Sequence, residues 1–123
     1  VGETAQRLEV AIDGLLAARL GVDGGRDRAD YQINWIVGCN PAGVALMEGV
    51  GSSFVPGYHH RYNAIPGNPR GAVPGAILNG FVRAFPHVDR PWLDLYPAPN
   101  ADYHANEPWL LQNNRWLEVL AWW

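Results

Sequence analysis

The sequence contains little charge and no long apolar run, and both features exclude classes of function. Charged residues make up 17% of the 123 residues, the net charge is -3, and no basic stripe runs along the chain. We therefore expect no nucleic-acid partner, since proteins of that class concentrate Lys and Arg on one surface. No apolar stretch approaches the roughly 20 residues that cross a bilayer, so we expect no membrane partner.

The first residues also lack the features of a signal peptide, which are a charged start followed by an apolar stretch. This does not settle the compartment, because the start of the sequence can be a processed or truncated end. We leave the localisation open, with a secreted or periplasmic protein included.

Cysteine is nearly absent, with Cys39 as the single example. One cysteine cannot form a disulfide within the chain, which excludes a disulfide-stabilised scaffold. A thiol nucleophile needs a nearby base, and the sequence places none beside Cys39. Because free cysteine is among the most buried residue types, we expect Cys39 to lie in the core.

Glycine, proline and tryptophan are abundant, with 14, 10 and 6 residues respectively. Such glycine and proline contents are typical of long ordered loops or of disorder. The tryptophans argue against disorder, because disordered segments are poor in aromatic residues. We therefore expect one compact, loop-rich domain on a helical frame. Aromatic side chains in such loops suit flat ligands such as sugar rings, although any single tryptophan is more simply explained as core packing.

Helical periodicity is confined to the two ends of the sequence. Apolar residues recur at helical spacing over 3–20 and again over 28–37, and a short helix is possible over 42–47. A last helix is expected over 107–122, with Asn106 as its cap and Pro108 tolerated in its first turn. Its inward stripe is predicted to consist of Trp109, Asn113, Trp116, Leu117 and Leu120.

The segment from 40 to 106 lacks this periodicity and carries most of the glycines and prolines. A loop of this length in a compact domain is usually functional. Over residues 48–106 we expect no strand pairing beyond a short hairpin. Its polar residues cluster at 59–61 and at 102–107, which favours a functional role. The overall prediction is an all-α protein with three to four helices and long irregular loops.

Three histidines, at 59, 60 and 104, raise the possibility of a metal site. His59 and His60 are adjacent and would point apart on regular structure, and neither an HExxH motif nor paired cysteines are present. The serines at 52 and 53 do not form a nucleophile elbow. We therefore expect neither a metal nor another cofactor.

Glu107 is the residue best suited to acid catalysis. A glycosidase needs one carboxyl group to protonate the leaving oxygen and a second one to activate water or to attack carbon. A general acid also needs a raised pKa, whereas a helix N-terminus favours the charged form. From the residues alone, the favoured interpretation of Glu107 is a first-turn glutamate that helps to cap its helix.

Four segments, in the same order along the chain, resemble glycoside hydrolase family 9. Residues 46–51 (LMEGVG) continuing to 58–61 (YHHR) are similar to the family's F-V-T-G-F-G and P-H-H-R segments. Residues 74–80 (PGAILNG) resemble P-G-A-L-V-G-G, and residues 102–107 (DYHANE), followed by Asn113, resemble D-Y-x-x-N-E. Residues 33–41 are similar to a helix that ends in L-G-x-N-P. The resemblance covers about residues 28–121.

This resemblance implies an (α/α)6 toroid and inverting hydrolysis of β-1,4-glucan bonds. By its motif position, Glu107 matches the general acid, and His59 and Arg61 match the residues that hold the sugar. Tyr58 or Tyr103 is expected to stack on a sugar ring. The carbohydrate is the expected substrate, and we expect the three motif residues to face one cleft.

The sequence also departs from the family pattern. Ala98 replaces an aspartate, Trp109 a small residue, and Tyr58 a proline. These changes leave the sugar open, and an amino sugar or a uronic acid is compatible with them.

The catalytic base is missing, because the family's D-A-G-D-like motif does not occur. A toroid of about twelve helices is also longer than this chain. We therefore interpret residues 1–123 as the C-terminal portion of a family 9-like catalytic domain. A missing N-terminal segment or a second chain would complete it, so the chain by itself should expose a large apolar surface. The alternative is a non-catalytic carbohydrate-binding or assembly module.

Overall fold

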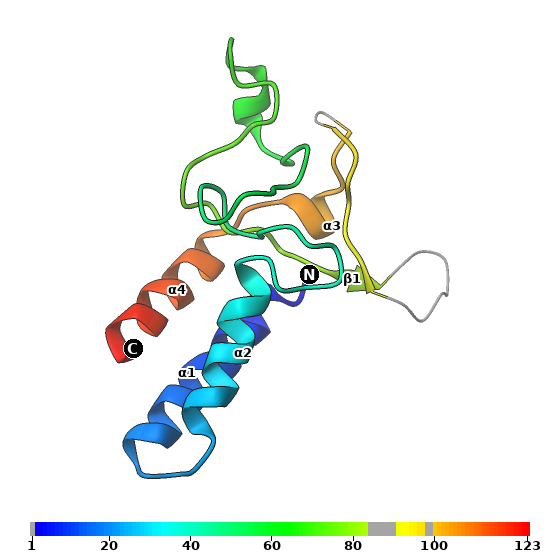
Figure 1. The fold of residues 1–123 in the computed structure, drawn as a ribbon. Coiled ribbons are helices and arrows are strands. Elements are labelled where there is room, and N and C mark those ends of the chain that lie inside the picture. The colour runs from blue at the N-terminus through cyan, green and yellow to red at the C-terminus, as the bar shows by residue number, and fades with distance from the viewer. Residues whose placement is uncertain (1, 84–90, 98–99) are drawn as a thin grey trace.

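The structure, a computed structural model, describes residues 2–83, 91–97 and 100–123. It is mainly helical, which confirms the all-α prediction (Figure 1). The elements in chain order are α1 (Thr4–Arg19), α2 (Gly25–Ile36), the 3-10 helix η1 (Arg61–Ala64), β1 (Val82–Arg83), β2 (Pro91–Trp92), α3 (Tyr103–Asn106) and α4 (Leu110–Trp122).

Helices α1 and α2 form a tight hairpin, and α1 also packs against α4. Leu8, Ala11 and Leu15 recur along one face of α1 and are buried, as amphipathic spacing dictates. The two helices touch through glycine: a Cβ on Gly14 would lie 2.7 Å from the Gly25 carbonyl oxygen. The helix expected over 3–20 is confirmed, and α2 begins three residues earlier than its predicted start at 28.

The region between α2 and α4 is mostly irregular but well anchored. The predicted short helix at 42–47 is wrong, because Gly43 adopts a left-handed φ of 63° and the chain then continues extended. Isolated bridges join Ala45 to Phe54 and Met47 to Ile77. Strands β1 and β2 pair antiparallel over two residues each, which confirms that the described residues of this region hold no more than a short hairpin.

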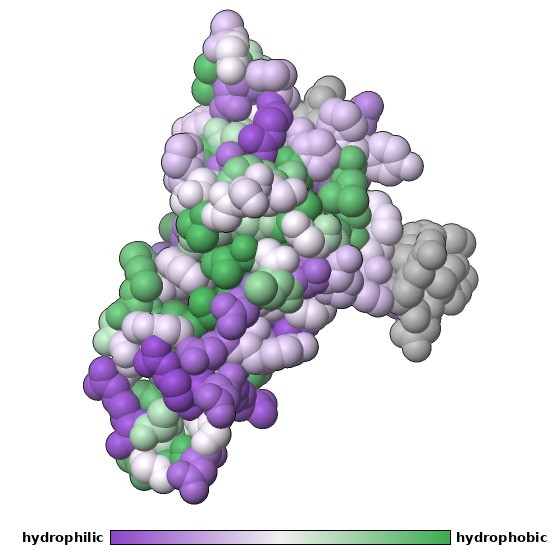
Figure 2. Space-filling model, in the orientation of Figure 1, coloured by the Kyte–Doolittle hydropathy of each residue, from purple (hydrophilic) through white to green (hydrophobic). Residues whose placement is uncertain are grey.

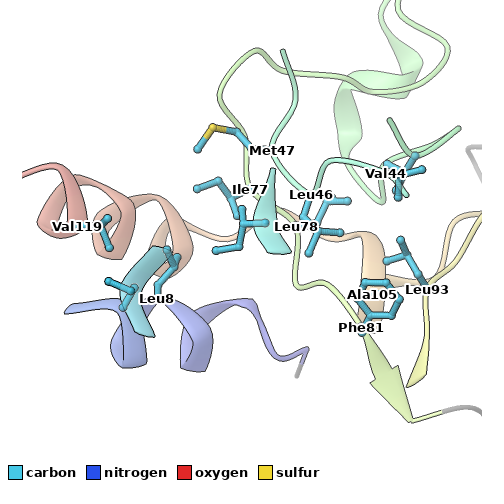
Figure 3. Close-up of a cluster of buried hydrophobic side chains, with 14 of the residues drawn as sticks. Leu8, Val44, Leu46, Met47, Ile77, Leu78, Phe81, Leu93, Ala105 and Val119 are labelled. Carbon is cyan, nitrogen blue, oxygen red and sulfur yellow. The ribbon is translucent and has the colours of Figure 1, made fainter. Parts of the chain in front are cut away.

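The core lies where the irregular region meets the helices. Figure 3 shows Leu46, Ile77 and Leu78 between Val119 of α4 and Ala105 of α3. The bridges therefore bring parts of the middle segments into the interior, where Leu46, Ile77 and Leu78 are fully buried. This arrangement fixes the segment around residue 107, which is connected at one end to α3 and at the other to α4.

Helix α4 buries a different face from the predicted one. Gln112 and Val119 are its buried residues, and Trp116 packs at the edge of the core. Leu117 and Leu120 are 64% and 56% exposed, so their assignment to the inward stripe is wrong. The large exposed hydrophobic residues of α4 are Leu110, Leu111, Leu117, Leu120 and Trp122.

Apolar surface is thus displayed along α4, as expected for this chain by itself. Figure 2 shows hydrophobic residues gathered over this helix. Cys39 is exposed, so its predicted place in the core is wrong. No helix among the described residues is long and apolar enough to cross a membrane.

Candidate active site

Glu107 lies in an extended segment between α3 and α4. Its backbone angles are φ -86° and ψ 126°, outside the helical region. The cause is Pro108, because a residue that precedes proline is disfavoured in the α conformation. Helix α4 begins only at Leu110, so the predicted helix start at 107 is wrong.

The capping roles expected at this junction are also wrong. Asn106 is the last residue of α3, and it is fully buried. No side chain of the described residues caps α4, whose N-cap residue is Trp109. Glu107 is therefore not a first-turn glutamate, and helix capping does not explain its presence.

Asn79 anchors the backbone of the Glu107 segment. Its N–H donates to the Glu107 carbonyl at 3.0 Å, and its side-chain amide donates to the Tyr103 carbonyl at 2.9 Å. Its Oδ1 in turn accepts from Gln112 of α4 at 2.7 Å. A bridge between Leu78 and Pro108 continues the contact. One buried side chain thus ties together both ends of the segment that carries Glu107.

Asn106 links the same segment to the loop that carries His59. Its amide donates to the Gly57 carbonyl at 2.9 Å and to the Asp94 carbonyl at 2.7 Å. The His59 N–H donates to the Asn106 carbonyl at 3.0 Å. The backbones of His59 and Glu107 are therefore held next to each other although they are far apart in sequence.

The His59 ring is oriented by two contacts. Its Nδ1 lies 2.9 Å from the Ala101 carbonyl oxygen, and a carbonyl only accepts, so Nδ1 carries the proton. In the neutral ring, Nε2 is then the acceptor. The ring meets Tyr103 edge to face at 5.8 Å between centroids. Both His59 and Tyr103 are exposed, so they present a polar edge and an aromatic face to solvent.

The Glu107 carboxyl group is partly exposed and has one hydrogen-bond donor. The indole Nε1 of Trp109 donates to Oε2 at 2.7 Å. Among the described residues, no hydrogen bond reaches Oε1. Glu107 therefore keeps one carboxyl oxygen without a described hydrogen bond, on a segment whose backbone lies next to that of His59.

Residues 4–117 match the model of one protein family, Glycosyl hydrolase family 9. The chain belongs to that family. Neither the curated proteins nor the solved structures gave a match. Family 9 membership implies glycoside hydrolysis of cellulase type at the level of the family, and the mainly helical fold is consistent with a part of the family's (α/α)6 toroid.

The position of Tyr58 is incompatible with its expected role, which is to stack on a sugar ring in a family 9 site. The side chain is fully buried, and its hydroxyl donates to Glu48 Oε2 at 2.6 Å. Arg70 pairs with the same carboxylate at 2.9 Å. Burial, reinforced by Glu48, raises the pKa of Tyr58 well above its usual range, while Arg70 opposes the shift. We therefore correct the assignment of Tyr58 from substrate binding to the core.

Arg61 is the first residue of η1, in the part of the chain that projects furthest from the helices in Figure 1. It is exposed, and within the described ranges no hydrogen bond or ion pair engages its guanidinium. The Asn106 contact of His59 places the start of this projection beside the family 9 acid position. That Arg61 and Glu107 face one cleft stays a prediction.

Two other acids of this region are already engaged. Asp94 is buried and accepts from the backbone N–H groups of Tyr96, at 2.9 Å, and of Asp102. Asp102 caps α3 and contacts His104 Nδ1 at 2.8 Å. Asp94 therefore has no free carboxylate for the role of a base, whereas Asp102 is partly exposed and its described hydrogen bonds all reach Oδ1. The departure at Ala98 lies outside the described residues.

Metal-ligand geometry is absent from the part of the chain that the structure describes, where no three His, Cys, Asp or Glu side chains are grouped. His59 and His104 flank Tyr103, whose ring lies 5.8 Å from the first and 3.8 Å from the second, so they form an aromatic group.

Sequence reasoning missed Asn79 and the contact of Trp109, the two residues that fix the Glu107 segment. One indication for Trp109 was present in the sequence. It lies two residues after Glu107, and on an extended segment side chains at that spacing point to the same side.

Proposed function

We propose that this chain carries the general acid of an enzyme that hydrolyses β-glycosidic bonds in an oligosaccharide or polysaccharide with inversion. The acid is Glu107. The observation that carries the proposal is its partly exposed carboxyl group, which is released from helix capping and receives a single donor. The motif position of Glu107 within family 9 supports the same role.

In the proposed reaction, the Glu107 carboxyl donates its proton to the oxygen of the leaving sugar. A second carboxylate removes a proton from water, which attacks the anomeric carbon from the opposite face. An inverting pair sits roughly 6.5–9.5 Å apart to leave room for that water. His59 accepts a sugar hydroxyl at Nε2, Tyr103 stacks on a ring face, and Arg61 donates to further hydroxyl groups.

The base comes from outside this chain, either from a further segment of a longer polypeptide or from a partner chain that completes the toroid. The exposed apolar face of α4 supports this, because surfaces of that kind are usually covered by another element. The burial of Asp94, whose two carboxylate oxygens accept from backbone N–H groups, points the same way.

A second candidate function is a non-catalytic carbohydrate-binding or assembly module. It is favoured by the burial of Asp94, whose carboxylate accepts two backbone N–H groups, and by the absence of the family's base motif from the sequence. In that case His59 and Tyr103 bind the sugar without hydrolysis.

Glu107→Gln in the complete protein tests the proposal. The amide keeps the shape and still accepts from Trp109, but it cannot donate a proton to the leaving oxygen. Hydrolysis of β-1,4-linked oligosaccharides should fall by about 10²–10⁴-fold, the usual contribution of a general acid. A dinitrophenyl glycoside needs little protonation and should lose far less. Sugar binding, measured by calorimetry, should be nearly unchanged.

Glu9→Gln is the matched control, since Glu9 is an exposed glutamate of α1 that makes one long contact to Arg115. It should leave both substrates unaffected. Equal hydrolysis of the oligosaccharide by Glu107→Gln and by the unmodified protein would exclude the acid role. Sugar binding by the unmodified protein without hydrolysis of either substrate would favour the binding module.

A further inference from the structure

The contact between Trp109 and Glu107 is set by the backbone. Residues 107–109 are extended, with Trp109 at φ -123° and ψ 148°. Side chains two residues apart on an extended segment point to the same side. The bridge from Leu78 to Pro108 and the hydrogen bond from Asn79 to the Glu107 carbonyl hold that segment in place. The indole is therefore directed to the carboxyl group by the fold.

The contact distinguishes the two oxygens of Glu107. An indole N–H only donates, so Oε2 must act as the acceptor in the 2.7 Å hydrogen bond. A proton on Oε2 would face the indole N–H, which is unfavourable. In the protonated carboxyl group the proton therefore resides on Oε1, the oxygen that no described residue engages.

We propose that Trp109 is a positioning residue that makes Oε1 the proton-bearing oxygen of the general acid. This rests on the proposed role of Glu107. The Trp109 side chain is 54% exposed, so its contribution to core packing is small. The family pattern has a small residue at this position, so the hydrogen bond is an addition made by this chain.

Trp109→Phe tests the proposal, because it keeps an aromatic ring and removes the N–H group. In the complete protein, kcat on the oligosaccharide should fall about 10-fold, as expected for the loss of one hydrogen bond to a charged group. KM should change by less than about 2-fold, and so should the rate on the dinitrophenyl glycoside, which does not depend on the acid. A structural role would instead lower both rates together.

Trp123→Phe is the matched control. Trp123 is 51% exposed and stacks on Arg26, and the 13-residue helix α4 separates it from Glu107 by about 20 Å. Both substrates should be processed at the unmodified rate. A loss in this variant similar to that of Trp109→Phe would mean that any exposed tryptophan has the effect and would overturn the inference.

A spectroscopic measurement examines the contact without any substrate. The indole N–H resonance of Trp109 is assigned in a ¹⁵N spectrum as the signal missing from Trp109→Phe. It should shift in Glu107→Gln, because an amide oxygen is a weaker acceptor than a carboxylate, while the Trp123 signal should not move. An unmoved Trp109 signal would exclude the contact and overturn the inference.

The outcomes separate the inference from the function on which it rests. If Glu107→Gln hydrolyses the oligosaccharide at the unmodified rate, the acid role fails and the inference fails with it. If Glu107→Gln loses the oligosaccharide activity but Trp109→Phe does not, or if Trp109→Phe slows both substrates equally, the positioning role alone is overturned.

Discussion

Glu48 and Glu107 lie in the same irregular region, yet their surroundings are opposite. Glu48 accepts three hydrogen bonds, one from the Tyr58 hydroxyl and two from the Arg70 guanidinium. Its side chain is only 12% exposed. Glu107 accepts a single hydrogen bond from Trp109 and remains partly exposed. Each glutamate has an aromatic donor, but among the described residues a cation pairs only with Glu48.

The Glu48 carboxylate cross-links segments of the loop, whereas the Glu107 carboxylate remains available. Arg70 also donates to the Val55 carbonyl at 2.8 Å, so the Glu48 group joins three segments of the loop. Its acceptor positions are filled, and its charge is neutralised by Arg70. Glu107 is held by its backbone instead, which leaves one oxygen free for chemistry. Substitutions of the two glutamates and of Asn79 and Tyr58 test this contrast.

The largest expected effect on stability is at Glu48. Glu48→Ala leaves the Arg70 guanidinium and the buried Tyr58 hydroxyl without their acceptor, which should cost about 3 kcal/mol of unfolding free energy. Glu107→Ala removes one exposed hydrogen bond and should cost less than about 1 kcal/mol. Urea denaturation followed by circular dichroism measures both. Equal losses in the two variants would contradict the contrast.

Asn79→Ala should have an intermediate effect, about 2 kcal/mol, because the Tyr103 carbonyl and the Gln112 amide lose their buried partner. It should also loosen the segment that carries Glu107, because the Asn79 side chain connects Tyr103, which precedes that segment, with Gln112, which follows it. Hydrogen exchange of the amides at 105–110 measures that loosening. Asn114→Ala, an exposed change on α4, should leave both stability and exchange unaltered.

An effect that is absent at neutral pH is a pH dependence that belongs to the Glu48 group. The pKa of Tyr58 is raised in the folded protein by burial, so above about pH 10 the unfolded state loses its phenolic proton first. Stability is fully present below that pH and should fall by up to about 1.4 kcal/mol per pH unit above it. The chain has no lysine, so no amine side chain titrates there. Urea titrations between pH 9 and 12 should give a flatter slope for Tyr58→Phe, and an unchanged slope would exclude Tyr58 as the cause.

The sequence predicted the helices well where a helix buries a single face against a single neighbouring core. The periodicity of Leu8, Ala11 and Leu15 on α1 is regular because a single core lies beneath it. On α4 the same reasoning selected Leu117 and Leu120, whereas Gln112 and Val119 are buried. Apolar residues surround α4 on several sides, and the sequence alone does not show which side a neighbour covers.

The start of α4 was predictable from a local rule. Pro108 is compatible with a first helical turn, but it also forces the residue before it into an extended conformation. The second rule prevails here, because Leu78 supplies a bridging partner for Pro108 from a distant segment. Glu107 consequently leaves the helix and becomes the linker between α3 and α4.

The candidate site was predictable in part. Motif positions indicated Glu107 and His59, and the structure holds their backbones together through Asn106. The burial of Tyr58 was not predictable, because its hydrogen-bond partner Glu48 lies 10 residues away in the sequence. Arg70, which pairs with Glu48, lies a further 22 residues from that glutamate. Side-chain pairing over such distances depends on the folded loop and leaves no periodic pattern in the sequence.

The glycine contact between α1 and α2 has a consequence for the order of folding. These helices are joined only by residues 20–24, so their interface closes over a short loop at low entropic cost. The Glu107 segment instead depends on contacts such as that from Asn106 to Gly57, which spans 49 residues. Because contacts of short sequence separation form fastest, the hairpin should assemble early and the acid segment late. The arrangement that we propose for catalysis is therefore the part of the chain that a partly folded molecule lacks.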